Sequence, residues 1–239
     1  MKLVAASVND LESAATYNSS GASQFEASEQ RERKFGDEPT GSFGSGAFAL
    51  HQETLHLSGK GRHRMTIRLI DTHCHLDSES FHQEIDQVVQ RANDAGVEKI
   101  LAIGITVETT QAAILLSNRY PCVLAMAGIH PNHTHEAKPD DWERIEDLAA
   151  HPHVIGVGET GLDKYWDFAP LEIQRDNFFR HIELSKKLKK PFAVHCREAE
   201  PEVLDVLRTA AGEDGHLNGL MHAFCGNAET AKTCLELGL

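Results

Sequence analysis

The sequence has no long apolar run. Its apolar segments are all shorter than the ~20 residues that a membrane-spanning helix needs. The apolar stretch near the start extends only from Leu3 to Ala6, and polar and acidic residues follow it at once. This pattern argues against a secretory signal peptide. We therefore expect a soluble protein of the cytoplasm that has no membrane partner.

Cysteine is scarce, and positive charge is in deficit. The five cysteines are an odd number and include no Cys-x-x-Cys pair, which argues against a disulfide framework and favours a reducing compartment. The formal net charge of −13 excludes a broad basic surface of the kind that attracts nucleic acid. A phosphate-bearing ligand would have to be held by local positive charge or by bound cations. Nothing in the composition indicates an obligate protein partner.

The sequence contains two regions of different composition. Residues 1–64 are rich in Ser, Gly, Glu and Ala and show no lasting apolar periodicity. Such a segment buries too little apolar surface to offset the entropy that it would lose on ordering, so we expect a disordered polar extension. From residue 65 onward, apolar segments with strand and helix periods follow one another. We therefore predict one globular domain over 65–239.

Strands and helices are predicted to alternate throughout this domain. The short, mostly apolar strand segments are typical of a parallel sheet covered by helices. The predicted strands span 66–71, 97–104, 122–128, 154–158, 192–195 and 217–222, and the predicted helices span 81–95, 106–119, 140–150, 170–189, 201–211 and 228–237. Ser78 or Ser80 would cap the first helix and Gly96 would end it. The pattern predicts an α/β fold of the TIM (β/α)₈-barrel type, with about six of its eight β/α units present.

Histidine and glutamate, residue types that commonly bind metals, lie at or just after the carboxyl ends of most of these strands. His73 and His75 follow the first strand, and side chains two residues apart in an extended chain point to the same side. Glu159 follows the fourth strand, while His195 and His222 end the fifth and sixth. In a (β/α)₈ barrel these strand ends meet at one mouth, where active sites lie. We therefore expect the five side chains to form one cluster.

Four histidines and a carboxylate exceed what one tetrahedral zinc ion needs, and they suit a centre of two divalent ions such as Mg, Mn or Zn. In our interpretation His73 and His75 hold one ion, and His195 and His222 hold the other. Glu159 would bridge the two. Two cations about 3.5–4 Å apart can clamp the attacking and leaving oxygens of a phosphodiester. They would also neutralise phosphate charge, which reconciles an acidic chain with an anionic substrate.

Three further polar residues lie near these positions in the sequence. Asp163 could orient a metal ligand, or it could cap a helix or form a turn. Arg197 lies two residues after His195, on the same face of the strand, and could contact phosphate. His130, after the third strand, could do the same. A structural role is equally open for each of these residues.

Five motifs, taken in order, resemble those of one known family. DTHCHLD, GIHP, GVGETGLD, PFAVHCREA and MHAFCG are similar to the motifs of the TatD-related metal-dependent deoxyribonucleases, which are amidohydrolase-like TIM-barrel hydrolases. The resemblance covers residues 65–239. It implies hydrolysis of DNA phosphodiester bonds with a divalent ion, often as a 3′–5′ exonuclease. It also implies a set of metal ligands, namely His73, His75, Glu159, His195 and His222.

The sequence departs from the family in one respect. The family's final metal ligand is an Asp near a Glu-Thr-Asp-x-Pro motif, and this sequence contains no such motif. About two of the eight β/α units are also absent from the predicted pattern. We therefore expect a barrel that is incomplete at its C-terminal side, with a deoxyribonuclease activity weakened by that absence.

Two other functions stay open at this stage. Relatives that hydrolyse C–N bonds share the His-x-His pair and the barrel histidines, but they commonly carry a carboxylated Lys on the fourth strand. This sequence has Glu159 there, which favours the phosphodiesterase. The other alternative is a protein that binds metal without catalysing a reaction.

Overall fold

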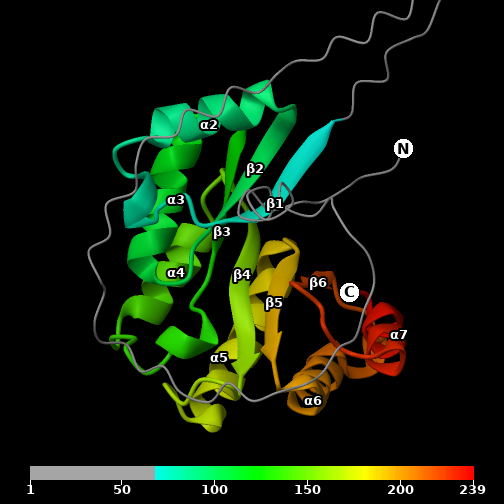
Figure 1. Ribbon diagram of the computed structural model, residues 1–239. Helices are drawn as coiled ribbons and strands as arrows, with labels where there is room; N and C mark the ends of the chain where they lie inside the picture. Colours follow the sequence, from blue (N-terminus) through cyan, green and yellow to red (C-terminus); the bar gives the residue numbers. More distant parts are fainter. Residues whose placement is uncertain (1–67) are drawn as a thin grey trace, which may run out of the picture. The chain divides into compact units, whose positions relative to one another are not determined.

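The computed structural model describes residues 68–239. The polar extension expected over 1–64 and the predicted start of the domain at residue 65 lie outside the described residues. Six parallel strands form one sheet in which the spatial order follows the chain, from β1 to β6. Helices alternate with the strands and lie along the outer side of the curved sheet (Figure 1). The structure is a parallel α/β half-barrel, which confirms the predicted fold class.

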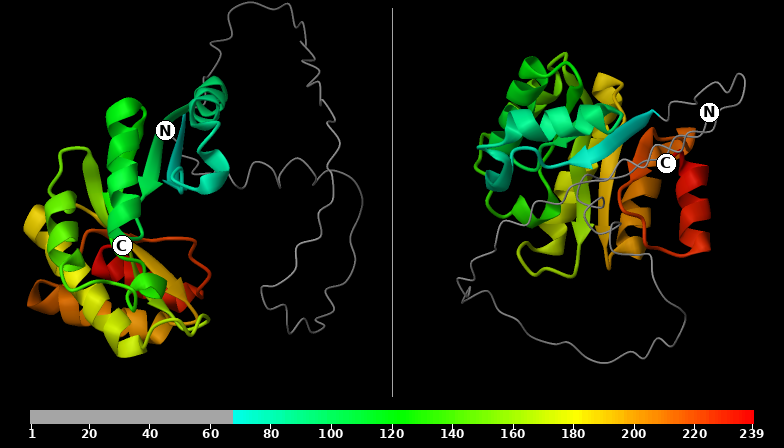
Figure 2. Two further views of the ribbon diagram at one scale, coloured as in Figure 1. Left: turned by 90° about the vertical axis from the view of Figure 1, so that its left-hand side faces the viewer. Right: turned by 45° about the horizontal axis from the view of Figure 1, so that its top comes forward.

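Each strand is followed by a helix. The strands are β1 (Leu69–Cys74), β2 (Val97–Ile103), β3 (Val123–Ala127), β4 (Val154–Asp163), β5 (Phe192–Arg197) and β6 (Gly219–Met221). The α-helices are α2 (Ile85–Asp94), α3 (Val107–Arg119), α4 (Asp141–Ala149), α5 (Leu171–Leu188), α6 (Glu200–Ala211) and α7 (Ala228–Leu237), and three 3₁₀ turns are η1 (Glu79–Phe81), η2 (Pro131–His133) and η3 (Gly212–Asp214). Helices α6 and α7 pack side by side next to the last strands (Figure 2). No helix in residues 68–239 combines the length and apolarity needed to cross a bilayer.

Apolar side chains cover both faces of the sheet. Ala102, Ala125 and Val194 belong to the main core beneath the helices. Their chain neighbours Ile103 and Met126 belong to a second, smaller apolar cluster. Because successive strand residues point to opposite faces, the two clusters lie on the two sides of the sheet. This explains why the strands read as nearly continuous apolar runs rather than as alternating ones.

Strand β4 is longer than predicted. It continues past residue 158 to Asp163 because its last residues pair with β5 as far as the partners Asp163 and Arg197. Glu159 and Asp163 are therefore strand residues, whereas the predicted strand stopped at residue 158 with Glu159 at its end. Nearly every residue of β4 is buried, since the strand is paired with β3 on one side and β5 on the other.

The first helix begins later than predicted. A 3₁₀ turn precedes it, and α2 starts only at Ile85. The hydroxyl groups of Ser78 and Ser80 lie 2.8 Å apart and hydrogen-bond with each other, and neither caps the helix. The predicted cap is therefore wrong. Gly96 follows the helix with a φ of +91°, a backbone conformation that glycine adopts without strain, as expected for a residue that ends a helix.

Candidate metal centre

The predicted metal-binding side chains lie at the carboxyl ends of the strands. His73 is in β1, Glu159 is in β4 and His195 is in β5. His75 comes directly after β1, and His222 directly after β6. Because the strands are parallel, their carboxyl ends open on one edge of the half-barrel. The sheet thereby brings together residues that are far apart in the sequence.

One group of possible ligands consists of His73, His75 and Glu159. The Nε2 atoms of the two histidines lie 3.3 Å apart. The Nε2 atom of His73 also lies 3.3 Å from Oε2 of Glu159. One ligand atom from each of the three residues falls within 4.8 Å of the others. Two imidazole nitrogens and a carboxylate oxygen that converge in this way are suitable donors for a divalent transition-metal ion.

A second group shares the same glutamate. Oε1 of Glu159 lies 3.0 Å from Nδ1 of His195 and 4.0 Å from Nε2 of His130. These three residues also bring one ligand atom each within 4.8 Å of the others. Glu159 therefore presents Oε2 to the first group and Oε1 to the second. This is the arrangement that a carboxylate shared between two ions requires.

The structure groups His195 with Glu159 and His130, whereas the sequence paired His195 with His222. His222 does not belong to either group of convergent ligand atoms among the described residues. Its ring instead stacks on that of His73, with centroids 3.6 Å apart and planes 13° apart. The short strand β6 ends before His222, whose backbone N–H donates to the carbonyl oxygen of Val194 at 2.9 Å. His222 thus lies beside His73 of the first group.

His130 belongs to the second group by distance, but its tautomer argues against metal ligation. Its Nδ1 atom accepts a hydrogen bond from the backbone N–H of Asn132 at 3.1 Å. The proton of the neutral ring is therefore on Nε2, the nitrogen that faces Glu159. Burial lowers the pKa of His130 to about 3, so the ring is neutral at physiological pH. A neutral N–H group at this point suits donation to a substrate oxygen, the role that the sequence suggested.

Glu159 is almost completely buried, with 3% of its surface exposed. Burial by itself would raise the pKa of this carboxyl group. Hydrogen bonds from His195 and His73 outweigh that effect and hold the pKa of Glu159 well below its ordinary value. Burial also lowers the pKa of His75 and of His222. The ionised carboxylate of Glu159 and the lowered pKa of His75 and His222 favour the protonation states that metal binding requires.

Asp163 links the centre to the loop after β4. Its Oδ2 atom lies 3.0 Å from Nε2 of His195 and accepts a hydrogen bond from Nδ2 of Asn132 at 3.2 Å. Its Oδ1 atom accepts the backbone N–H groups of Tyr165 and Trp166 at 2.9 and 3.0 Å. Asp163 therefore orients His195 and forms a turn at the same time, although it caps no helix. Burial would lower the pKa of His195, but hydrogen bonds to Glu159 and Asp163 outweigh it and raise that pKa.

Arg197 ends β5 and is exposed. Its guanidinium carbon lies 3.8 Å from the centroid of the Tyr165 ring, in a cation–π arrangement. The sequence placed Arg197 beside His195 as a phosphate contact. The structure puts it on the loop side of the centre, stacked on an aromatic ring.

A cavity of about 400 Å³ opens at the centre. The predicted residues His75, His130 and Glu159 line it. It is also lined by Asn132 and Phe168, which sequence reasoning missed. Asn132 directly follows the GIHP motif, so its position next to His130 was a usable signal. Phe168 lies in a loop without periodicity, and only the folded chain brings it to the cavity.

The chain is similar to known proteins of one family. The family described as "TatD related DNase" matches residues 70–239. The chain is 34% identical over 169 residues to the uncharacterized metal-dependent hydrolase YabD of Bacillus subtilis, an alignment that covers 71% of this chain and 66% of YabD. It is 33% identical over 171 residues to the 3'-5' ssDNA/RNA exonuclease TatD of Citrobacter rodentium, with 72% and 64% covered.

A solved structure agrees with this assignment. The crystal structure of YjjV, a TatD homologue from Escherichia coli K12, superposes with a TM-score of 0.66 at 27% sequence identity and covers 72% of this chain and 66% of that one. The chain thus spans a little less than two thirds of the length of the relatives that it matches. Both the family match, which extends over most of the chain, and the shared fold lead to the same conclusion: the chain belongs to the TatD-related DNase family.

Proposed function

We propose that this protein is a divalent-metal-dependent hydrolase that cleaves phosphodiester bonds in DNA, acting on single strands from the 3′ end. The observation that carries the proposal is the position of Glu159, whose carboxylate oxygens face His73 on one side and His195 on the other. Membership in the TatD-related family supports it, as does the name of the Citrobacter relative.

The residues present fit two divalent ions. His73, His75 and one oxygen of Glu159 would hold the first, while His195 and the other oxygen would hold the second. We keep His222 as a further ligand because its ring stacks on that of His73 and because the charge of Glu159 acts on its pKa. When bound, the ions would supply positive charge that offsets the charge of the phosphate and polarises its bonds.

The remaining side chains would position the substrate and the ligands. Asp163 holds Nε2 of His195 and so leaves Nδ1 directed at Glu159. Such an outer partner fixes the orientation and the tautomer of a ligating histidine. His130 remains neutral, and its Nε2–H can donate to a phosphate oxygen in the cavity that it lines.

Nucleotide release from a single-stranded oligonucleotide tests the proposal. We expect the full chain to release nucleotides only weakly from the 3′ end in Mg²⁺ or Mn²⁺ and to stop when EDTA is added. Glu159→Gln should abolish this release. Glu172→Gln, which removes an exposed carboxylate of α5, is the matched control and should leave it unchanged.

Two outcomes would contradict the proposed phosphodiesterase activity. Cleavage of a cyclic amide, with no release from the oligonucleotide, would assign the centre to C–N bond hydrolysis. Stoichiometric Mn²⁺ binding in a calorimeter with neither substrate cleaved would show a protein that binds metal without catalysing hydrolysis.

A further inference from the structure

Three large aromatic side chains are exposed together in the loop between β4 and α5. Tyr165, Trp166 and Phe168 have 49%, 43% and 52% of their surface exposed. The rings of Trp166 and Phe168 stack with centroids 5.4 Å apart and planes 8° apart, and Tyr165 meets Trp166 edge-on at 4.8 Å. We call these three residues the aromatic surface. A group of large apolar side chains left in water commonly marks a binding site.

The aromatic surface is continuous with the candidate metal centre. The backbone of Tyr165 and Trp166 is held by Oδ1 of Asp163, whose Oδ2 contacts His195. Phe168 lines the same cavity as Glu159. A ligand bound at the centre therefore has the aromatic surface as its immediate neighbour, and one carboxylate fixes the two relative to each other.

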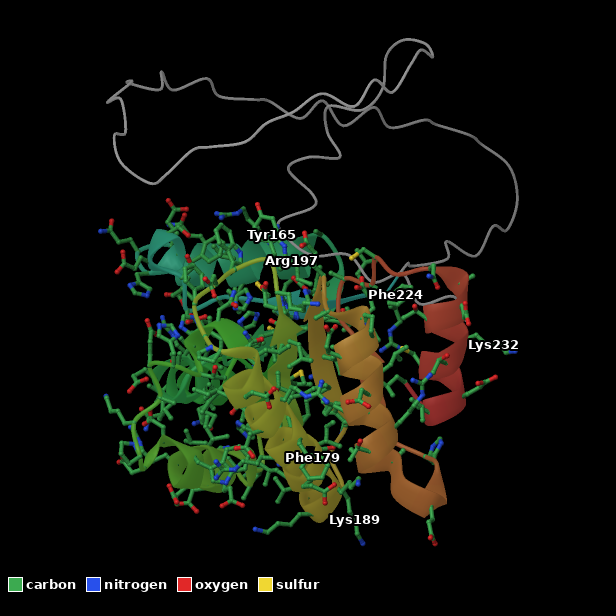
Figure 3. All side chains as sticks on the ribbon, turned by 90° about the horizontal axis from the view of Figure 1, so that it is seen from below. Tyr165, Phe179, Lys189, Arg197, Phe224 and Lys232 are labelled. Atoms are coloured by element: carbon green, nitrogen blue, oxygen red, sulfur yellow. The ribbon has the colours of Figure 1, made fainter. Side chains whose placement is uncertain are left out.

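A positive charge accompanies these rings. The guanidinium group of Arg197 lies 3.8 Å from the centroid of Tyr165 and 5.8 Å from that of Trp166. Figure 3 shows Tyr165 and Arg197 together, whereas Phe179 lies at the opposite end of the view. Phe179 is also partly exposed, at 36%, but it is remote from this group. Exposed aromatic residues therefore occur elsewhere, but the aromatic surface adjoins the candidate metal centre and has the guanidinium group of Arg197 against it.

We propose that the aromatic surface stacks the unpaired bases of a single-stranded nucleic acid next to the phosphodiester that enters the centre, with Arg197 against the adjacent backbone. This inference rests on the proposed function and names the means of substrate recognition. The net charge of −13 gives the chain no general attraction for a polyanion. Base–aromatic stacking needs no such attraction and accepts every base. Paired bases are stacked within a duplex, so the surface would select single strands.

Binding of a cleavage-resistant phosphorothioate oligonucleotide tests the inference on the full chain in Mg²⁺. Fluorescence anisotropy of the labelled strand gives the dissociation constant. We expect Trp166→Ala and Phe168→Ala each to bind about tenfold more weakly, the scale of one lost base–aromatic stack. Trp166→Phe keeps an aromatic ring and should retain most of the affinity. Phe179→Ala removes an exposed aromatic side chain outside the surface and should bind like the wild type.

An abasic oligonucleotide of the same length separates base stacking from phosphate binding. It should bind weakly to the wild type and equally weakly to Trp166→Ala. Equal wild-type affinity for the normal strand, the abasic strand and a duplex would overturn the inference, even if the protein hydrolyses DNA. Base-dependent binding that is lost in Trp166→Ala, together with a complete lack of cleavage of a normal oligonucleotide, would instead overturn the proposed function and leave the inference standing.

Discussion

Strands β4 and β6 both bring a residue to the candidate centre, but they hold it differently. β4 has ten residues, is almost wholly buried and is paired on both sides. β6 has three residues, and within residues 68–239 it pairs with β5 alone. Glu159 of β4 is 3% exposed, while Leu220 of β6 is 42% exposed. One strand is therefore fixed by its neighbours, and the other is supported from one side.

The difference concerns how the centre is organised before any ligand binds. Moving the Glu159 side chain would break its contacts with His195 of β5 and His73 of β1, so its two oxygens stay directed at these two residues. His222 is held by one backbone hydrogen bond to Val194 and by stacking on His73. A site built on paired strands is more rigid than one built on a strand end. We infer that the β4 side provides the fixed part of the centre and the β6 side the adjustable part.

The largest effect is expected where β4 holds the shared carboxylate. Glu159→Gln removes a ligand from both groups at once, so we expect the affinity for Mn²⁺ to fall by more than about 100-fold. His222→Gln changes a residue outside the two groups of ligand atoms and should cost only about tenfold. Titration calorimetry with Mn²⁺ measures both. Equal losses would show that the end of β6 contributes as much to the centre as β4 does.

The backbones of β4 and β6 differ in how tightly they enclose a glycine. Gly161 in β4 has a φ of +140°, and a Cβ atom there would overlap the carbonyl oxygen of His195. Gly219 in β6 has no such φ, and its Cβ atom would meet the ring of Phe192 at 2.7 Å. We expect Gly161→Ala to lower the free energy of unfolding by about 4 kcal/mol, because the paired backbone cannot shift.

Gly219→Ala should cost only about 1–2 kcal/mol, since an edge strand can move away from the ring. Urea unfolding, followed by circular dichroism, gives both values. If the two variants lose the same stability, pairing on two sides does not make β4 more rigid than β6.

A smaller, pH-dependent effect is expected behind β4, where α5 packs. His181 of α5 is completely buried, and its Nε2 accepts the backbone N–H of Ile129 at 3.0 Å. Burial lowers the pKa of His181 to about 4. In the unfolded chain the pKa is about 6.5, so the unfolded state binds the proton first as the pH falls. The stabilisation is fully present above about pH 6.5 and is lost progressively toward pH 4, by at most about 3 kcal/mol.

The slope of unfolding free energy against pH tests this expectation. His181→Gln should flatten the slope between pH 6.5 and 4 relative to the wild type. His216→Gln, at an exposed position before β6, is the control and should leave the slope as it is. An unchanged slope in His181→Gln would mean that the pKa of this histidine is not lowered in the folded state.

Several features followed from local pattern. The two-residue spacing of His73 and His75 predicted that their rings would share one side, and their Nε2 atoms are 3.3 Å apart. The alternation of apolar segments predicted parallel strands separated by helices, which the sheet order confirms. The predicted end of β4 was wrong by several residues. Polar residues such as Glu159 and Asp163 resemble loop residues when their neighbours on β5 are unknown.

The sequence by itself determined the class of fold and the family, and it predicted a set of side chains that could bind metal. These depend on short-range periodicity and on motifs that are read one residue at a time. Only the tertiary structure decided which side chains meet: Glu159 lies between two groups, His222 stacks on His73, and the aromatic surface adjoins the cavity. Such pairings depend on strand register and on hydrogen bonds between distant segments, and no local pattern contains that information.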